Sequence, residues 1–167
     1  MSFNAKFLDA RQHEVQRQSH FKIAIEGFDE EFLLHIRTAA LLEKSFQPIE
    51  TRYFNDLVKQ AGVRSFTDMP LDIHDAIGPD VERKLHAWQE QIMNSVTGYM
   101  GYAADYKRSA KITEYNINGE VRSVWQYEGV WPATINYGGL SREDVTKKSV
   151  SVTLSYDRGR LLSQAEM

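Results

Sequence analysis

The sequence predicts a mainly β protein of the α+β class, in which antiparallel strands surround a single amphipathic helix. Three observations support this prediction: strict alternation of apolar and polar residues over 149–156, an Asn-Gly turn at 118–119 between two strand-like runs, and one helical stripe within about 79–95. A period of two is typical of strands that bury one face, whereas a period near 3.6 is typical of helices.

The composition of the 167-residue chain indicates one folded domain with short ends. Hydrophobic residues make up 42% and charged residues 26%, so the chain is too apolar to be disordered throughout. We expect an N-terminal arm at 1–19, a β domain at 20–157 and a C-terminal tail at 158–167. The arm carries few apolar residues, among them Phe3 and Phe7, and is therefore expected to dock on another surface.

Charge and cysteine content exclude several classes of protein. The chain has no cysteine, which excludes disulfides, thiol nucleophiles and thiolate-bound metals. A net charge of −3 argues against a dedicated nucleic-acid binder, which would carry a basic stripe. The sequence lacks both the roughly 20 consecutive apolar residues of a membrane-spanning helix and a signal peptide, so we expect a soluble protein made inside the cell, without membrane insertion.

The first part of the domain predicts a β-hairpin. Apolar and polar residues alternate over 21–25, a turn follows at 27–30, and alternation resumes over 32–36. The next stretch is less clearly patterned. Helix formers occupy 39–44 until Pro48 ends them, 49–57 and 66–77 read as extended, and 61–62 reads as a break. Pro70 favours an edge position for its strand.

The clearest helix begins at Pro79, because proline fits the first turn, where its missing N–H would be unpaired anyway. Its apolar residues recur at intervals of three and four and form one stripe, expected to pack on the sheet: Val81, Leu85, Trp88 and Ile92. A linker is expected at 98–105.

Two more strands are predicted on either side of the Asn-Gly turn, at 110–117 and 121–130. Asn-Gly favours a two-residue type I′ turn, since both central residues then need a positive φ. Trp125 in the second strand is a candidate core residue.

The last strand alternates most strictly. Val150, Val152, Leu154 and Tyr156 are expected to be buried, while a short uncharged face lies opposite. That polar face consists of Ser149, Ser151, Thr153 and Ser155.

No set of residues suggests a catalytic centre, and we expect a protein that is not an enzyme and holds no metal or cofactor. The histidines lack the spacing of metal ligands. Asp72, His74 and Asp75 would suit a metal-dependent hydrolase, but no second His-Asp set completes such a site. Lys147 and Lys148 favour protection of a strand edge over phosphate binding, and Trp131-Pro132 is a candidate interface anchor.

Five segments, in order, resemble the tail tube proteins of contractile-tailed bacteriophages. The first is the Ala-Gly-Val-Arg-Ser-Phe stretch at 61–66 with Asp68. It is followed by a Trp-Gln pair within 85–89, Tyr-Lys-Arg-Ser-Ala at 106–110, Gly-Val-Trp-Pro within 128–132, and the strand at 149–157. The last four segments lie within 73 residues, 85–157. The residues at 12–19, the linker and the tail after 157 depart from the family pattern.

The resemblance implies a fold of two packed antiparallel sheets, in a sandwich or barrel-like arrangement, flanked by a helix. It also implies hexameric rings that stack into a hollow tube, with sheath and baseplate proteins as partners and DNA in transit during ejection. The protein would then belong to the virion and be assembled in the host cytoplasm. Phe3, Phe7, Trp131, Pro132, Lys147 and Lys148 become candidate subunit contacts, and the polar face of the last strand becomes a candidate lining of the channel.

Alternatives remain open within and outside this family. A tube-initiating baseplate subunit or a secretion-system tube protein would have the same fold. A monomeric ligand-binding β-sandwich and the hydrolase described above are the alternatives from other classes.

Overall fold

The structure is a computed structural model that describes residues 20–75, 80–142 and 147–162. In these ranges the chain forms nine strands and three short helices. In chain order they are β1 (Phe21–Ile25), α2 (Glu30–Leu34), β2 (Ile36–Ala39), β3 (Lys44–Tyr53), β4 (Asp56–Phe66), β5 (Met69–His74), α3 (Val81–Ile92), α4 (Ala103–Tyr106), β6 (Arg108–Tyr115), β7 (Val121–Asn136), β8 (Ser149–Ser155) and β9 (Arg158–Leu161).

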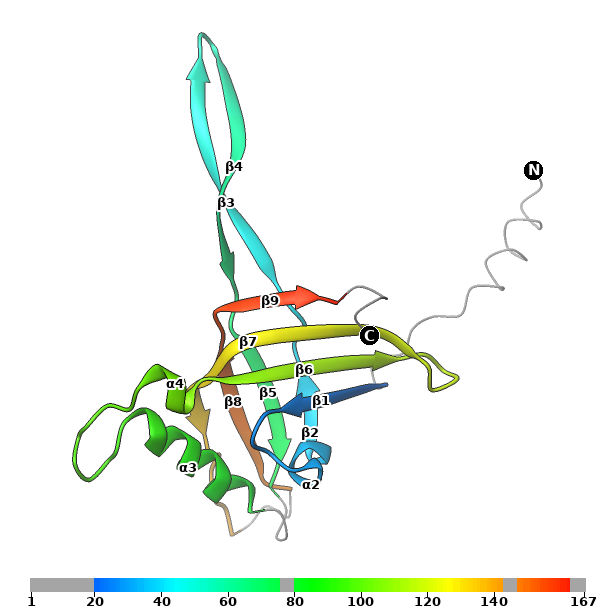
Figure 1. Cartoon of the computed structure of the whole chain (residues 1–167), viewed down its shortest axis with the longest axis vertical. Coiled ribbons are helices and arrows are strands. Elements are labelled where there is room, and N and C mark those ends of the chain that lie inside the picture. Colours follow the sequence, from blue (N-terminus) through cyan, green and yellow to red (C-terminus); the bar gives the residue numbers. More distant parts are fainter. Residues whose placement is uncertain (1–19, 76–79, 143–146, 163–167) are drawn as a thin grey trace.

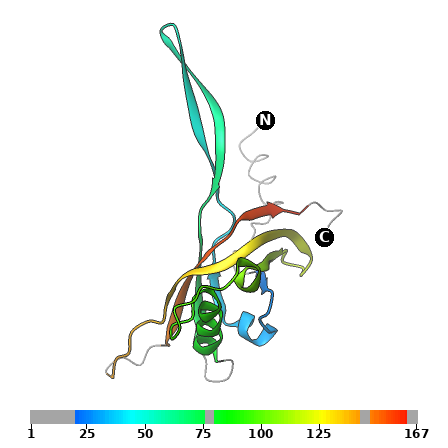
Figure 2. The same cartoon turned by 60° about the vertical axis from the view of Figure 1, so that its left-hand side comes forward.

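Two antiparallel sheets share the long strand β7 (Figures 1 and 2). The first part of β7, up to Val130, pairs with β6 and β9, and β6 pairs in turn with β1. From Trp131 onward β7 pairs with β8, which leads through β5 to β2. The predictions of a mainly β fold and of two antiparallel sheets are therefore confirmed.

The core gathers side chains from both sheets and from α3. Val81, Leu85 and Trp88 are at most 1% exposed, and Ile92 is half-buried. The Trp88 indole Nε1–H donates to the Tyr106 carbonyl at 2.7 Å, so the buried ring has its polar atom satisfied. The predicted stripe is thus correct, although the helix ends at Ile92, before the predicted end near 95.

The hairpin predicted over 21–36 is wrong. Residues 30–34 form α2, which is followed by β2, and β1 pairs with β6 instead of with the returning segment. Phe32 and Leu33 are both buried although they are adjacent in sequence, which a strand with alternating faces does not allow. The alternation over 32–36 was too short to separate a helical turn from a strand.

The segment from 44 to 66 forms a long hairpin of β3 and β4. The helix-like run at 39–44 forms no helix, and Ala61-Gly62, expected to be a break, lies inside β4. Pro48 fits into β3 because the register shifts between Phe46 and Pro48, at a β-bulge.

Pro70 lies inside the sheet, between β8 and β2, and not on an edge strand. The Pro70 carbonyl accepts a hydrogen bond from Ala40 N–H and therefore points toward β2. The nitrogen of a strand residue points to the same side as its carbonyl, so the Pro70 nitrogen also faces β2. The last β2 pair is Ala39 with Leu71, so the missing N–H of Pro70 falls just beyond that ladder.

The β6–β7 hairpin is confirmed, but its turn is not type I′. Within 116–120 only Gly119 has a positive φ, of 80°. Asn116 N–H donates to the Glu120 carbonyl, and Gly119 N–H donates to the Asn116 carbonyl. This is the three-residue loop in which a type I turn is followed by a left-handed glycine.

The predictions of a linker and of a C-terminal tail both need correction, because each segment contains part of a helix or a strand. The expected linker at 98–105 contains the start of α4. Residues 158–161 of the expected tail form β9, which pairs with β7, and Leu162 is buried. The expected arm at 1–19 lies outside the described residues.

Candidate interaction surfaces

The β3–β4 hairpin projects from the body of the molecule (Figures 1 and 2). Every residue of β3 is exposed, as is nearly every residue of β4. The exposed side chains include many large apolar ones: Phe46, Ile49, Tyr53, Phe54, Leu57, Val58 and Val63. A two-stranded hairpin without a covering layer is only marginally stable in water, so this segment is suited to packing against another surface.

The two faces of the hairpin differ in chemistry. The register pairs Thr51 with Val58 and Ile49 with Gln60, so Ile49 and Val58 lie on one face together with Thr51. The other face carries an ion pair between Glu50 and Lys59, at 3.0 Å. The first face offers apolar area for contact, while the second combines this ion pair with the exposed Leu57, which is paired with Arg52.

An apolar groove, here called the slot, lies between β1 and α2. Its apolar lining comes from the two ends of the described sheet and from the helix between them: Phe21, Ile23, Leu33, Leu34 and Ile36. The slot encloses about 290 Å³. An ion pair between Lys22 and Glu30 lies at its rim, while Leu34 is 80% exposed.

The polar face of β8 has the predicted alternation. Val150, Val152 and Leu154 are at most 1% exposed, whereas Ser149 and Ser151 are exposed and Thr153 and Ser155 are half-buried. The Ser151 hydroxyl donates to the Asp72 carboxylate at 2.9 Å. Hydroxyls therefore make up this face of β8, and their place in an assembly stays a prediction.

The candidate contact residues near the other end of the sheet are partly engaged within the chain. Pro132 is buried, and the half-buried Trp131 ring meets Tyr106 edge-on, with 6.3 Å between ring centroids. Lys147 is exposed. The candidate residues Phe3 and Phe7 lie outside the described residues, and a role of this set in subunit contacts stays a prediction.

Lys148 links the start of β8 to α3. It forms ion pairs with Glu82 and, at 3.5 Å, with Asp75. The hydrogen bond with Glu82 is the main cause of the raised pKa of Lys148, so the ammonium stays charged. Lys148 therefore forms ion pairs within its own chain, whereas the sequence analysis expected it to protect a strand edge from pairing.

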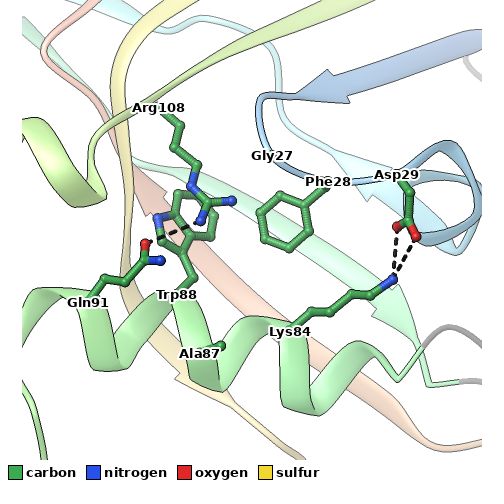
Figure 3. A pocket seen from close by; sticks show the side chains of 8 residues that line it. All are labelled: Gly27, Phe28, Asp29, Lys84, Ala87, Trp88, Gln91 and Arg108. Carbon is green, nitrogen blue, oxygen red and sulfur yellow. Dashed lines mark hydrogen bonds and ion pairs between the residues drawn. The ribbon is translucent and has the colours of Figure 1, made fainter.

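A second concave site lies between α3 and the turn after β1 (Figure 3). The Arg108 guanidinium lies 4.7 Å from the Trp88 ring and 4.9 Å from the Phe28 ring, and it donates to the Glu26 carbonyl and to Gln91 Oε1. Burial lowers the pKa of Arg108. The guanidinium therefore joins α3 to the turn through cation–π contacts and hydrogen bonds.

Lysines beside this site are also paired. Lys84 donates to both Asp29 oxygens, at 2.8 and 2.9 Å, and this hydrogen bond holds the pKa of Asp29 below its ordinary value. Lys107 donates to both oxygens of Asp157, at 2.6 and 2.9 Å. Lys107 and Arg108, which are adjacent in the sequence, therefore both make contacts within the chain.

Two of the three residues of the hydrolase alternative, Asp72 and Asp75, have separate partners, and the buried Nδ1 of His74 has none within the described residues. Asp72 accepts from Ser151, Asp75 pairs with Lys148, and burial lowers the pKa of His74. Among residues 20–75, 80–142 and 147–162, no three His, Cys, Asp or Glu side chains lie close enough to hold a metal ion. In the same ranges no helix has the length and apolar character required to cross a bilayer.

The chain is similar to two curated phage proteins along most of its length. It is 24% identical over 150 residues to the tail tube protein gp19 of Enterobacteria phage T6, and equally to gp19 of phage T4. Both alignments cover 86% of this chain and 91% of the relative. No protein-family model matches the chain. The relatives are named for a structural role in a tube, which fits a protein without catalytic activity.

Three solved structures with the same fold are similar to this chain along most of its length. The anti-feeding prophage cap superposes with a TM-score of 0.72 at 18% identity, over 90% of this chain and 93% of that one. The tube–sheath complex of an extracellular contractile injection system, PVC, gives 0.70 at 18% identity, over 98% and 99%. Hcp1 of Salmonella typhimurium gives 0.50 at 11% identity, over 85% and 84%. The chain is homologous to the tail tube protein gp19 of phages T4 and T6, and it has the same fold as the anti-feeding prophage cap and the PVC tube–sheath complex.

Proposed function

We propose that the chain is the subunit of an inner tail tube, in which hexameric rings stack into a hollow conduit for DNA ejection. The observation that carries this proposal is the projecting β3–β4 hairpin with its exposed apolar side chains. The homology to two phage tube proteins supplies the kind of assembly in which such a hairpin would be covered.

The energetic argument concerns apolar area. Seven large apolar side chains between Phe46 and Val63 are 46–91% exposed in a single chain. Burying one such side chain contributes about 1.5–3 kcal/mol, so covering even part of this set against other copies is a substantial driving force. The described end strands β1 and β2 also present main-chain groups that neighbouring copies in a ring can pair.

The polar face of β8 supports a conduit for DNA. We place Ser149, Ser151, Thr153 and Ser155 on the wall of the channel, where hydroxyls would meet passing DNA without gripping it. Each Lys or Arg contact with phosphate releases counterions and adds affinity, which would hinder transit. A chain with a net charge of −3 suits a wall from which DNA slides away.

The remaining parts of the proposal concern the particle. Sheath and baseplate proteins would surround the tube and start it, and the tube would be assembled in the host cytoplasm before it becomes part of the virion. A baseplate or cap subunit with the same fold is the second candidate, because the cap and the tube complex superpose on this chain almost equally well. Such a subunit would form single rings and no long tubes.

Electron microscopy of the purified protein tests the proposal. The expected result is hollow tubes of indefinite length built from six-fold rings, whereas single rings would favour the cap or baseplate role. A stable monomer at high concentration, measured by light scattering, would overturn the proposal and favour a ligand-binding sandwich.

A matched variant makes the same experiment specific to the hairpin. Replacing residues 45–65 with a short Gly-Ser turn removes the projecting strands but leaves both sheets and α3 in place. We expect an unchanged melting temperature of the body and a loss of tubes. If the shortened chain still formed tubes, the hairpin would not be the assembling element.

A further inference from the structure

The two end strands of the described sheet, β1 and β2, each have one edge that no described strand pairs. Among the described strands, β1 pairs with β6 and β2 pairs with β5, and neither has a second partner. We infer that the N-terminal arm, residues 1–19, binds along these two strands in its own chain before assembly and covers them. This binding goes beyond the proposed function, and only its consequence for assembly rests on the tube.

Two hollows lie on the open side of the molecule, between β1 and β2. The first is the slot, of about 290 Å³. The second encloses about 580 Å³, and its lining includes Ala39, Leu41 and Ile112. Phe21 lines both hollows, which are therefore adjacent and are together called the seam. Leu34 and Leu41 are 80% and 41% exposed, so the seam leaves apolar area open to solvent.

The arm begins at the seam. The carbonyl of His20, the first residue that the structure describes, accepts a hydrogen bond from Tyr115 N–H at 2.9 Å, which fixes the end of the arm beside β6. The next residue, Phe21, already lines both hollows. The arm is thus tethered to the seam without a linker, and a tether this short gives it an effective concentration there in the millimolar range.

The sequence of the arm suits such a groove. Phe3, Phe7 and Ala10 recur at intervals of four and three, the spacing of one helical face, whereas 11–14 and 16–19 are polar throughout. Fourteen positions separate Phe7 from Phe21, a span of about 21 Å for a helix and more for an extended chain. The five residues of β1 span about 17 Å, so Phe7 reaches either hollow.

A covered edge has a physical purpose. Soluble proteins keep unpaired strands from joining other chains by placing a helix or a loop over them, and the arm has the position and the length to do this for β1 and β2. In the proposed tube, neighbouring copies pair with these same edges. The arm and the neighbouring copies then compete, and the arm has to leave the seam before a ring closes.

Cross-linking within one chain tests where the arm binds, because the chain has no cysteine. The double variant Phe7→Cys/Leu34→Cys is kept dilute and unassembled, is treated with a short bismaleimide, and is analysed by intact mass. We expect a monomer in which one linker joins both thiols as the main product, formed at a rate that does not change on dilution.

The matched control places the second cysteine near the start of the arm but outside the seam. Glu120 is exposed, and its carbonyl accepts from Asn116 N–H, next to the Tyr115 N–H that binds His20. In Phe7→Cys/Glu120→Cys the tether is the same, so bridging that is about tenfold slower is expected if the arm is held in the seam.

Substitution in the arm gives an independent readout. Phe3→Asp/Phe7→Asp removes both aromatic side chains, and Asn4→Asp/Gln12→Asp adds the same charge at polar positions. Only the first variant is expected to increase the fluorescence of the apolar dye ANS, because it uncovers the seam. The same variant is expected to shorten the lag before tubes appear.

The outcomes separate this inference from the proposed function. Bridging that is equally fast in the Glu120 control, or equal dye binding by the two arm variants, would overturn the inference and leave the tube function standing. Cross-linked dimers whose yield falls on dilution would also overturn it, in favour of an arm that binds another copy. A wild-type protein that forms neither rings nor tubes would overturn the proposed function and leave the cross-linking result standing.

Discussion

The body of this chain, which consists of the two sheets that share β7 and of α3, differs from the β3–β4 hairpin in the exposure of its apolar side chains. In the body, the core side chains of the two sheets and α3 are almost fully buried, as with Trp88, Val152 and Leu154, at 1% exposure or less. In the hairpin, residues of the same types are 46–91% exposed. The body is complete within one chain, whereas the hairpin is suited to a surface that a single chain does not supply.

This difference separates folding from assembly. Substitutions in the body are expected to change the free energy of unfolding of one chain, because they remove contacts made within it. Substitutions in the hairpin are expected to change association, because the same apolar groups are largely solvated before other copies arrive. The following predictions, from the largest expected effect to the smallest, test this separation.

Trp88→Ala is expected to lower the free energy of unfolding by about 3–5 kcal/mol. It leaves a cavity in the core and removes the hydrogen bond to the Tyr106 carbonyl. Urea unfolding followed by circular dichroism measures the change. Tyr102→Ala is the control, because Tyr102 is 82% exposed, and a loss of stability as large as that of Trp88→Ala would contradict the assignment of the core.

Val152→Ala in the core is expected to cost about 2 kcal/mol, and Val58→Ala in the hairpin less than about 0.5 kcal/mol. The two valines are 1% and 46% exposed. When tube formation is measured by light scattering, at a temperature at which both variants are folded, Val58→Ala is expected to have the larger effect and Val152→Ala the smaller. Equal effects of the two substitutions on unfolding would break the separation of body and hairpin.

Gly129→Ala is expected to cost about 1–2 kcal/mol, since its φ of 69° is unfavourable for a residue with a Cβ. The added methyl would also displace the Asp157 carboxylate, which Lys107 binds. Gly119→Ala is the matched control, with a φ of 80° but open space around it. The difference between the two melting temperatures isolates the displacement of Asp157, and identical melting temperatures would contradict that role.

His74→Gln is expected to have the smallest effect, visible only as a change in pH dependence. Burial, with Arg37, Lys147 and His35 nearby, lowers the pKa of His74 below 6.5, against the opposing effect of Asp72. The folded state therefore binds this proton less readily than the unfolded state, and the stability due to neutral His74 is lost as the pH falls below 6.5. Urea unfolding at pH 7.5 and pH 5 is expected to show a smaller loss in the variant. His86→Gln, at an exposed position, is the control variant.

The sequence predicted those elements in which the alternation of buried and exposed residues can be recognised within the element itself. Four alternating pairs were enough to place β8, and the stripe from Val81 to Trp88 placed α3. The partner of β1 could not be predicted in this way, because its pairing with β6 joins residues about 90 positions apart and leaves no local pattern. The segment 32–36 was misjudged because α2 spans barely more than one turn.

The hairpin was missed for a different physical reason. Periodicity reports which face of an element is buried, and both faces of β3 and β4 are exposed in the single chain. At the tip of the hairpin, two adjacent apolar residues are followed by two polar ones and then by two more apolar ones, so no alternation marks it: Tyr53, Phe54, Asn55, Asp56, Leu57 and Val58. The slot was equally hidden, because α2 and the ends of the two sheets meet there only after folding. The polar face of β8 could be predicted, since it follows from the same alternation as its buried face.

The shared strand β7 has a mechanical consequence. Its sixteen residues run without interruption from one sheet into the other, held by β6 and β9 over the first part and by β8 over the second. Sliding one sheet past the other would require backbone hydrogen bonds along this single strand to break together. A force applied to either sheet is therefore carried into the other along a covalent chain.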